Sequence, residues 1–168
     1  MNAGLFFNPQ GRITKAQFQT GALALIALGF VLAVLPLLAA GTAMVAITTL
    51  TTLIGLVAMW CWIALWVKRL HQAGQTGWMT VLIVLGWVVL ANIVGTVVTM
   101  MFAPDLMTMS PEGGDVMEVI QQSMQATREV AIPSAIANAA VSLIYVFVLN
   151  AVLPSQDGEN RYGPPPAA

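Results

Sequence analysis

The sequence predicts an all-α fold: a polytopic membrane protein built as a bundle of four transmembrane helices, with a short amphipathic helix in one outer loop. The composition is the first observation behind this prediction, because 58% of the residues are hydrophobic and only 8% are charged. Soluble domains carry about 25% charged residues, which cover a surface that faces water. The second observation is that four apolar stretches reach the length of about 20 residues that a helix needs to cross a bilayer. Within 168 residues these stretches predict a single membrane domain.

The first two spans are predicted at residues 20–40 and 43–67, and neither contains a charged residue or a histidine. Thr14 and Gln17 have the spacing of a capping box, so the first helix is expected to begin before its span. A cleaved signal peptide is the competing interpretation of this region. We favour a retained helix, because a signal peptide has an apolar core of only about 7–15 residues and a second span follows here almost at once.

The third and fourth spans are predicted at residues 78–102 and 132–153, and they are equally free of charge. Before the third span, Gly74 is placed to end the preceding helix in a left-handed conformation, and Thr76 is placed to cap the next helix. Pro133 suits the first turn of the fourth helix, where its missing amide proton costs nothing. The two helices on either side of residue 74 are therefore expected to form a tight hairpin.

The outer loop, residues 103–131, is predicted to contain the short amphipathic helix. Asp115 and Glu118 are placed to cap it, and an apolar stripe recurs every four residues at Val116, Ile120 and Met124. Six of the ten methionines lie between Met100 and Met124. Thioethers are copper(I) ligands as well as flexible apolar side chains, and we interpret these methionines in the second way.

Charge placement predicts the orientation of the bundle. Five of the six cations fall on one face, in the two tails and the loop between the second and third spans: Arg12, Lys15, Lys68, Arg69 and Arg161. The sixth, Arg128, shares the outer loop with five acidic residues. Because positively charged segments stay on the cytoplasmic side, both tails, residues 1–19 and 154–168, are expected there. Trp66 and Trp78 are expected at the membrane interface, which aromatic side chains favour.

Small and polar side chains are predicted to hold the helices together. The fourth span carries Ser134, Asn138 and Ser142 at four-residue spacing, and the third carries Asn92. With a rise of about 1.5 Å per residue, the two asparagine amides lie at similar depths and are expected to meet. Such interhelical contacts contribute about 0.6 kcal/mol each. A polar transport path is the alternative, but it usually needs an ionisable side chain at depth, and the four spans contain none.

Three short motifs lie on the predicted cytoplasmic face: GRITKAQF at residues 11–18, RLHQAGQTGW at 69–78 and NRYGP at 160–164. In the same order, they resemble the signatures GRxxRxxFW, RLHDxGRSGW and NRYGxxP of a bacterial inner-membrane family called domain of unknown function 805. The resemblance implies a multi-pass protein of the bacterial inner (cytoplasmic) membrane, with the outer loop in the periplasm, and it implies no activity. The matching positions expected to have structural roles are Gly11, Phe18, Gly74, Thr76, Gly77, Trp78, Asn160, Gly163 and Pro164.

Four positions depart from the family pattern. Lys15 and Gln75 replace arginines, Gln19 replaces a tryptophan, and Gln72 replaces an aspartate. An aspartate at position 72 would be the obvious carboxylate partner for the imidazole of His71. Its replacement weakens any acid–base role that the resemblance implies for this histidine.

The candidate binding site gathers the cations of this face with the single histidine and a tyrosine: Arg12, Lys15, Lys68, Arg69, His71, Arg161 and Tyr162. Such a cluster suits an anionic lipid headgroup or a phosphate, because each cation near the surface contributes about 1 kcal/mol and arginine binds phosphate with two hydrogen bonds. One alternative is that the cations only set the topology and cap helices. Another is that they form a docking face for a different membrane protein or a second copy of the chain.

We therefore expect a non-enzymatic membrane protein whose partners are membrane lipids. The alternative functions are a small transporter or transporter subunit, and a membrane enzyme that acts on a lipid headgroup with His71 as its acid or base. No cofactor or metal is expected, because one cysteine, Cys61, and one histidine cannot form a metal-binding cluster. Nucleic-acid binding is not expected either, since six cations form no basic stripe.

Overall fold

The computed structural model describes residues 4–107 and 116–166, and most of these residues are helical. Four helical segments are long and apolar enough to cross a membrane: Lys15–Leu38, Gly41–Gln72, Met79–Phe102 and Gln125–Val152. The predicted all-α fold with four spans is confirmed. The elements in chain order are α1 (Gly4–Phe7), α2 (Lys15–Val34), the 3-10 helix η1 (Leu35–Leu38), α3 (Gly41–Gln72), α4 (Met79–Phe102), the 3-10 helix η2 (Pro104–Met107) and α5 (Val116–Val152).

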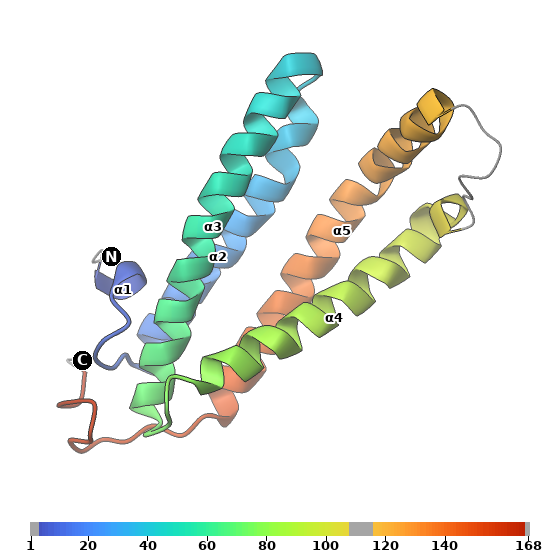
Figure 1. Ribbon diagram of the computed structural model, residues 1–168. Coiled ribbons are helices and arrows are strands. Elements are labelled where there is room, and N and C mark those ends of the chain that lie inside the picture. Colours follow the sequence, from blue (N-terminus) through green and yellow to red (C-terminus); the bar gives the residue numbers. More distant parts are fainter. Residues whose placement is uncertain (1–3, 108–115, 167–168) are drawn as a thin grey trace.

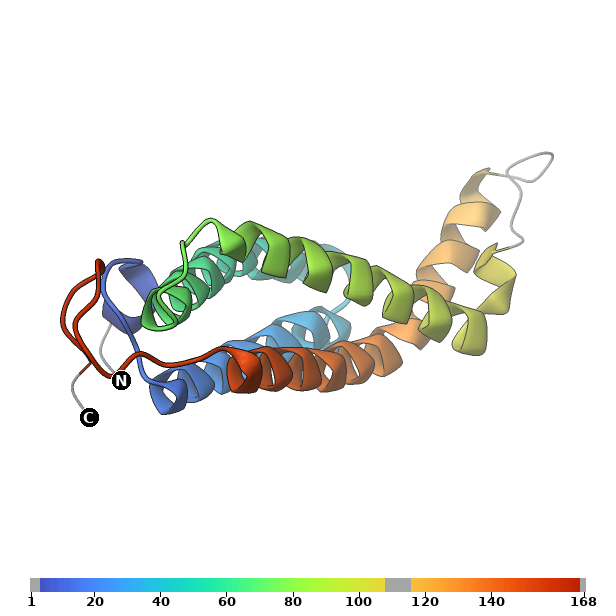
Figure 2. The same ribbon diagram turned by 90° about the horizontal axis from the view of Figure 1, so that it is seen from below.

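The long helices form two pairs, α2 with α3 and α4 with α5, which come together at one end of the molecule and spread apart toward the other (Figures 1 and 2). Both termini and the turn between α3 and α4 lie at the same end, which we call the closed end (Figure 1). α2 packs against α3 and α5, and α4 packs against α5, whereas α3 and α4 touch one another less. The two pairs of helices therefore meet at the closed end, where the three motifs lie (Figure 1).

The start of α2 has the predicted capping box. The Thr14 hydroxyl accepts a hydrogen bond from the Gln17 amide at 3.0 Å, and the Gln17 side-chain oxygen accepts one from the Thr14 amide at 3.0 Å. These bonds satisfy amides that have no partner within a helix, so α2 begins at Lys15, ahead of its apolar span. At the far end Pro36 lies in η1, where the regular helix stops.

Gly74 ends α3 in the left-handed conformation that the sequence predicts. Its φ is +73°, its amide donates to the His71 carbonyl at 3.1 Å, and the Gln75 amide donates to the Leu70 carbonyl at 2.9 Å. This pair of bonds is the Schellman pattern, which gives partners to carbonyls that the helix leaves free. α3 consequently extends beyond its predicted span and carries the first four residues of the second motif, 69–72, on its last turn.

The turn enters α4 without the threonine cap that was predicted. Trp78 is the N-cap residue of α4, and no side chain makes a capping hydrogen bond to the first turn of this helix. The Thr76 hydroxyl lies 3.5 Å from the Trp78 amide, at the limit of hydrogen-bonding distance. Instead, the Met79 amide donates to the Thr76 carbonyl at 3.2 Å, and the Thr80 amide donates to the Gly77 carbonyl at 3.0 Å. A tight turn of i→i+3 bonds thus replaces the side-chain cap.

α5 runs unbroken from Val116 to Val152, so it joins two elements that the sequence predicted as separate. The segment expected to be a short helix in the outer loop is the first part of α5, and Pro133 lies in the interior rather than in a first turn. A proline removes one helical hydrogen bond, which membrane helices tolerate where other groups supply a partner. The side chains of the predicted apolar stripe, Val116, Ile120 and Met124, lie outside the described residues.

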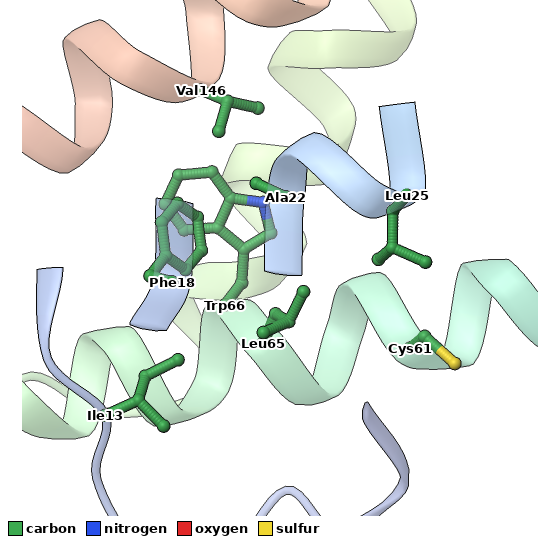
Figure 3. Packing of buried hydrophobic residues seen from close by; sticks show 8 residues of the cluster. All are labelled: Ile13, Phe18, Ala22, Leu25, Cys61, Leu65, Trp66 and Val146. Atoms are coloured by element: carbon green, nitrogen blue, oxygen red, sulfur yellow. The ribbon is translucent and has the colours of Figure 1, made fainter. Parts of the chain in front are cut away.

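The apolar core fills the space among α2, α3 and α5 near the closed end (Figure 3). Phe18 of the first motif is fully buried there, and its ring centroid lies 4.5 Å from that of Trp66. Trp66 was expected at the membrane interface, but only 3% of it is exposed. The cluster consists of Ile13, Phe18, Ala22, Leu25, Cys61, Leu65, Trp66 and Val146.

Two hydrogen bonds join α4 to α5. The indole nitrogen of Trp87 donates to the Ser142 hydroxyl at 3.1 Å, and the Tyr145 hydroxyl donates to the Ile83 carbonyl at 2.8 Å. A Cβ at Gly86 would lie 2.8 Å from the Tyr145 hydroxyl, so the glycine allows this close approach. Polar contacts of this kind hold membrane helices together.

Asn92 and Asn138 do not form the predicted contact with each other. The Asn92 amide donates to the Val88 carbonyl at 2.8 Å, and the Asn138 amide donates to the Ser134 carbonyl at 2.9 Å. Each amide thus satisfies its donor one turn back in its own helix, which needs no partner from a neighbour.

Candidate functional site

Arg69, on the last turns of α3, is fully buried and holds the end of α5. Its Nε donates to the side-chain oxygen of Asn150 at 2.6 Å, and one terminal nitrogen donates to the Pro154 carbonyl at 2.9 Å. The other terminal nitrogen donates to the carbonyls of Leu153 at 2.6 Å and Asn150 at 3.2 Å. The last carbonyls of a helix lack partners and carry partial negative charge. Arg69 supplies both hydrogen-bond donors and positive charge, and so ties α3 to α5.

Arg12 holds the C-terminal tail in the same way. Its side chain is 7% exposed, and its Nε donates to the side-chain oxygen of Gln72 at 2.9 Å. One terminal nitrogen donates to the carbonyls of Gly158 at 2.8 Å and Gly163 at 2.9 Å, and the other donates to the Gln156 carbonyl. A single guanidinium therefore fixes three points of the tail and joins them to α3.

Gln72 occupies the position where the family pattern has an aspartate, and its side chain points to Arg12. The side-chain nitrogen of Gln72 donates to the backbone carbonyl of Gln156 at 3.0 Å. The backbone carbonyl of Gln72 accepts from the backbone amide of Gln156 at 3.0 Å. An aspartate at this position would thus be placed to pair with Arg12. The expectation that this position serves the imidazole of His71 is not met in the structure.

The third motif folds into a small turn that rests on α3. Asn160 and Gly163 exchange backbone hydrogen bonds at 2.9 and 3.2 Å, and Gly163 has a φ of +113°. The Asn160 side chain donates to the His71 carbonyl at 3.0 Å and accepts from the Tyr162 amide at 2.9 Å. Pro164 follows this turn and is exposed. We call the side chains that tie the tail and α5 to α3 the polar network: Arg12, Arg69, Gln72, Asn150, Gln156 and Asn160.

Two lysines of the candidate site also point at backbone carbonyls. Lys68 is 3% exposed, and its ammonium group donates to the carbonyls of Gly4, at 2.8 Å, and Leu5 in α1. Lys15 donates to the Ala151 carbonyl at 3.0 Å, in the last turn of α5. Four of the predicted binding cations therefore hold parts of the chain together at the closed end.

His71, Arg161 and Tyr162 form a separate group on the surface of the closed end. The rings of His71 and Tyr162 are stacked, with centroids 3.7 Å apart and planes inclined by 10°. The guanidinium carbon of Arg161 lies 4.8 Å from the centroid of the Tyr162 ring, and Arg161 is exposed. Nδ1 of His71 lies 3.1 Å from the Gly11 carbonyl, to which it donates when it carries the proton. Nε2 of His71 faces Gly77, and a Cβ added to this glycine would lie 3.3 Å from Nε2.

An apolar groove of about 580 Å³ opens between α3 and α4, which contact each other less than α2 contacts α3 or α5. His71 and Tyr162 line its mouth at the closed end, together with Thr76 and Trp78. Trp78, which was predicted to lie at the membrane interface, is 81% exposed. The apolar walls extend away from the mouth along both helices and consist of Ile63, Val67, Val81, Val84 and Leu85.

Thr80 lies in the same groove and has an unsatisfied hydroxyl. The side chain is 4% exposed, and its oxygen has no hydrogen-bond partner among the described residues. Threonines elsewhere in the helices donate to a carbonyl of the preceding turn, as Thr52 and Thr99 do. The carbonyl one turn before Thr80 belongs to Thr76, which precedes α4 and accepts from Met79. An unpaired buried hydroxyl costs about 1–3 kcal/mol.

A second and more polar groove, of about 460 Å³, lies between α4 and α5. Asn92 and Asn138 both line it, so the two amides share a groove although they do not bind each other. None of the described residues that line this groove is ionisable, although a proton or ion path usually has an ionisable side chain. The other lining residues are Ala91, Gly95, Thr96 and Thr99.

Several residues of these sites carried no recognisable signal in the sequence. Asn150 and Gln156 are central to the polar network, and Thr80 lines the groove, but none belongs to a motif position singled out above. A lone asparagine near the end of an apolar span is the one available hint for Asn150. The part of the chain that the structure describes contains no group of three or more His, Cys, Asp or Glu side chains able to hold a metal ion.

The fold and the arrangement of its closed end define a multi-pass α-helical membrane protein. The family model described as Protein of unknown function (DUF805) matches residues 6–164, a range that contains all three motifs. The chain therefore belongs to this family, as the motifs predicted. No curated protein and no solved structure matches it.

Proposed function

We propose that the protein is a non-enzymatic membrane protein that binds an anionic lipid in the groove between α3 and α4. The observation that carries the proposal is the composition of this groove, which has apolar walls and a polar mouth beside an exposed arginine. Acyl chains match apolar walls that face the bilayer, and an anionic headgroup matches Arg161 at the membrane surface. Arg12 and Arg69 serve a different purpose, because their donors are occupied by the chain itself.

The charge balance of the closed end supports an anionic rather than a neutral ligand. Five cations lie there, against the two carboxylates of Asp157 and Glu159, which leaves a net charge of +3 from five minus two. The buried cations make their hydrogen bonds to neutral oxygens, so their charge is not cancelled by those contacts. Each cation near the surface attracts anionic lipid with about 1 kcal/mol.

Lipid retention by the purified protein tests this function. We expect Arg161→Ala to retain about fivefold less phosphatidylglycerol in native mass spectrometry, because about 1 kcal/mol of attraction is lost. Arg128→Ala is the matched control, since it removes an exposed cation from the other end of α5. Equal retention by the Arg161 variant and the parent would contradict the proposal.

We also propose that the closed end faces the cytoplasm of a bacterial cell and that the membrane is the inner one. Support comes from the five cations at this end, which match the positive-inside rule, and from the family resemblance. In intact cells, a cysteine introduced by Asp157→Cys is expected to stay unlabelled by a membrane-impermeant maleimide, whereas Gln125→Cys is expected to react. Cys61 is buried and gives a low background. Labelling of position 157 from outside would reverse the orientation.

A further inference from the structure

We infer that the groove selects a lipid whose chains are joined by ester bonds, and that Thr80 binds the ester carbonyl. This inference rests on the proposed function and adds the class of lipid to it. The observation behind it is the Thr80 hydroxyl, which is buried, lines the groove and has no partner among the described residues. A buried hydroxyl without a partner is rare in folded proteins, so a group outside the chain is expected to supply one.

The position of Thr80 fits this part of a lipid. Thr80 lies in the first turn of α4, four residues after Thr76, which stands at the mouth of the groove. Beyond Thr80, the groove is lined by Val84 and Leu85, which suit hydrocarbon. A glycerolipid has the same order of groups, because its ester bonds lie between the headgroup and the acyl chains. With Arg161 at the headgroup and Leu85 along the chain, an ester carbonyl falls at the depth of Thr80.

The chemistry of the two groups is complementary. A threonine hydroxyl has one hydrogen to donate, and an ester carbonyl oxygen accepts hydrogen bonds but cannot donate them. Within the chain, the backbone amide of Thr80 is already bonded to the Gly77 carbonyl, so only the hydroxyl is left to bind a ligand. Threonine in a helix adopts two χ1 rotamers, which allows the hydroxyl to turn when a ligand enters. An ether-linked lipid of the same shape offers no carbonyl at this place.

The test compares two phosphatidylglycerols of matched chain length, one with ester and one with ether linkages, on the full chain in mild detergent. In native mass spectrometry, the parent protein is expected to retain the ester lipid about fivefold more than the ether lipid, the value of one ordinary hydrogen bond. Thr80→Val, which keeps the shape and removes the hydroxyl, is expected to abolish this preference. Thr80→Ser, which keeps the hydroxyl, is expected to preserve it.

The possible outcomes separate the two proposals. If the parent retains both lipids equally, or if Thr80→Val keeps the preference, the hydroxyl does not recognise the ester, while lipid binding that depends on Arg161 still stands. If the parent retains neither lipid, both proposals fail. A preference that disappears in Thr80→Val and survives in Thr80→Ser supports the inference, because both variants leave Arg161 and the polar network intact.

Discussion

Replacing Arg69 by alanine is expected to lower the free energy of unfolding by about 3–5 kcal/mol. The side chain is fully buried, and all its hydrogen bonds go to the end of α5 and the residues just after it. Alanine would leave the side chain of Asn150 and the carbonyls of Leu153 and Pro154 without these donors. Denaturant unfolding in micelles, followed by the circular dichroism of the helices, measures the change.

Two further variants show whether this effect comes from the hydrogen bonds. Arg69→Lys keeps the charge but cannot reproduce the geometry of a guanidinium, so its stability is expected to fall between those of the parent and Arg69→Ala. Arg161→Ala removes a cation from the exposed surface of the same end and is expected to unfold like the parent. If Arg69→Ala unfolds at the same denaturant concentration as Arg161→Ala, Arg69 is not the tie between α3 and α5.

Replacing Arg12 by alanine is expected to release the C-terminal tail while the four long helices remain in place. Arg12 is bonded to the carbonyls of Gly158, Gly163 and Gln156, whereas the ends of α5 and α3 are joined by Arg69. The tail contains its own trypsin site after Arg161. Cleavage there is expected to become at least about tenfold faster, because proteolysis follows the population of the released state.

Mass spectrometry of the digestion products measures this rate, and circular dichroism checks that the helical content is kept. Lys15→Ala is the matched control, since the Lys15 ammonium group donates to the Ala151 carbonyl in α5 and to none of the tail carbonyls that Arg12 holds. Cleavage at Arg161 that is equally slow in the parent and in Arg12→Ala would show that other contacts hold the tail.

The fold was largely predictable, because a helix that crosses a bilayer must have a certain length and few charges, and both can be recognised in the sequence. Uncharged stretches of sufficient length specify the spans, and the capping box of Thr14 and the left-handed Gly74 specify two helix ends. Pro133 misled the prediction, because a proline that suits a first turn also fits inside a helix when its neighbours compensate for the lost bond. A single chain position cannot distinguish these two cases.

The site was only partly predictable, and the reason lies in the partners of the cations. An arginine that binds a headgroup and an arginine that binds carbonyls have the same sequence signature, because backbone carbonyls occur at every residue. In the structure they differ in burial: Arg69 is fully buried, whereas Arg161, which we propose to bind a headgroup, is exposed and makes one long hydrogen bond of 3.5 Å to the Gly74 carbonyl. The unpaired hydroxyl of Thr80 could not be predicted from the sequence either, because it depends on where α4 begins and on which carbonyls already accept hydrogen bonds in the turn.

Two roles are therefore distinguished for the arginines of the three motifs. Arg12 and Arg69 are buried and donate to carbonyls of the chain, whereas the exposed Arg161 is the one that we propose to bind lipid. The most direct test measures lipid retention and unfolding on the same two variants, Arg69→Ala and Arg161→Ala. The expected result is that Arg161→Ala loses phosphatidylglycerol about fivefold while the delipidated protein unfolds like the parent, and that Arg69→Ala is strongly destabilised. The opposite pattern, with lipid lost from a stable Arg69→Ala and stability lost from Arg161→Ala, would contradict this division of roles.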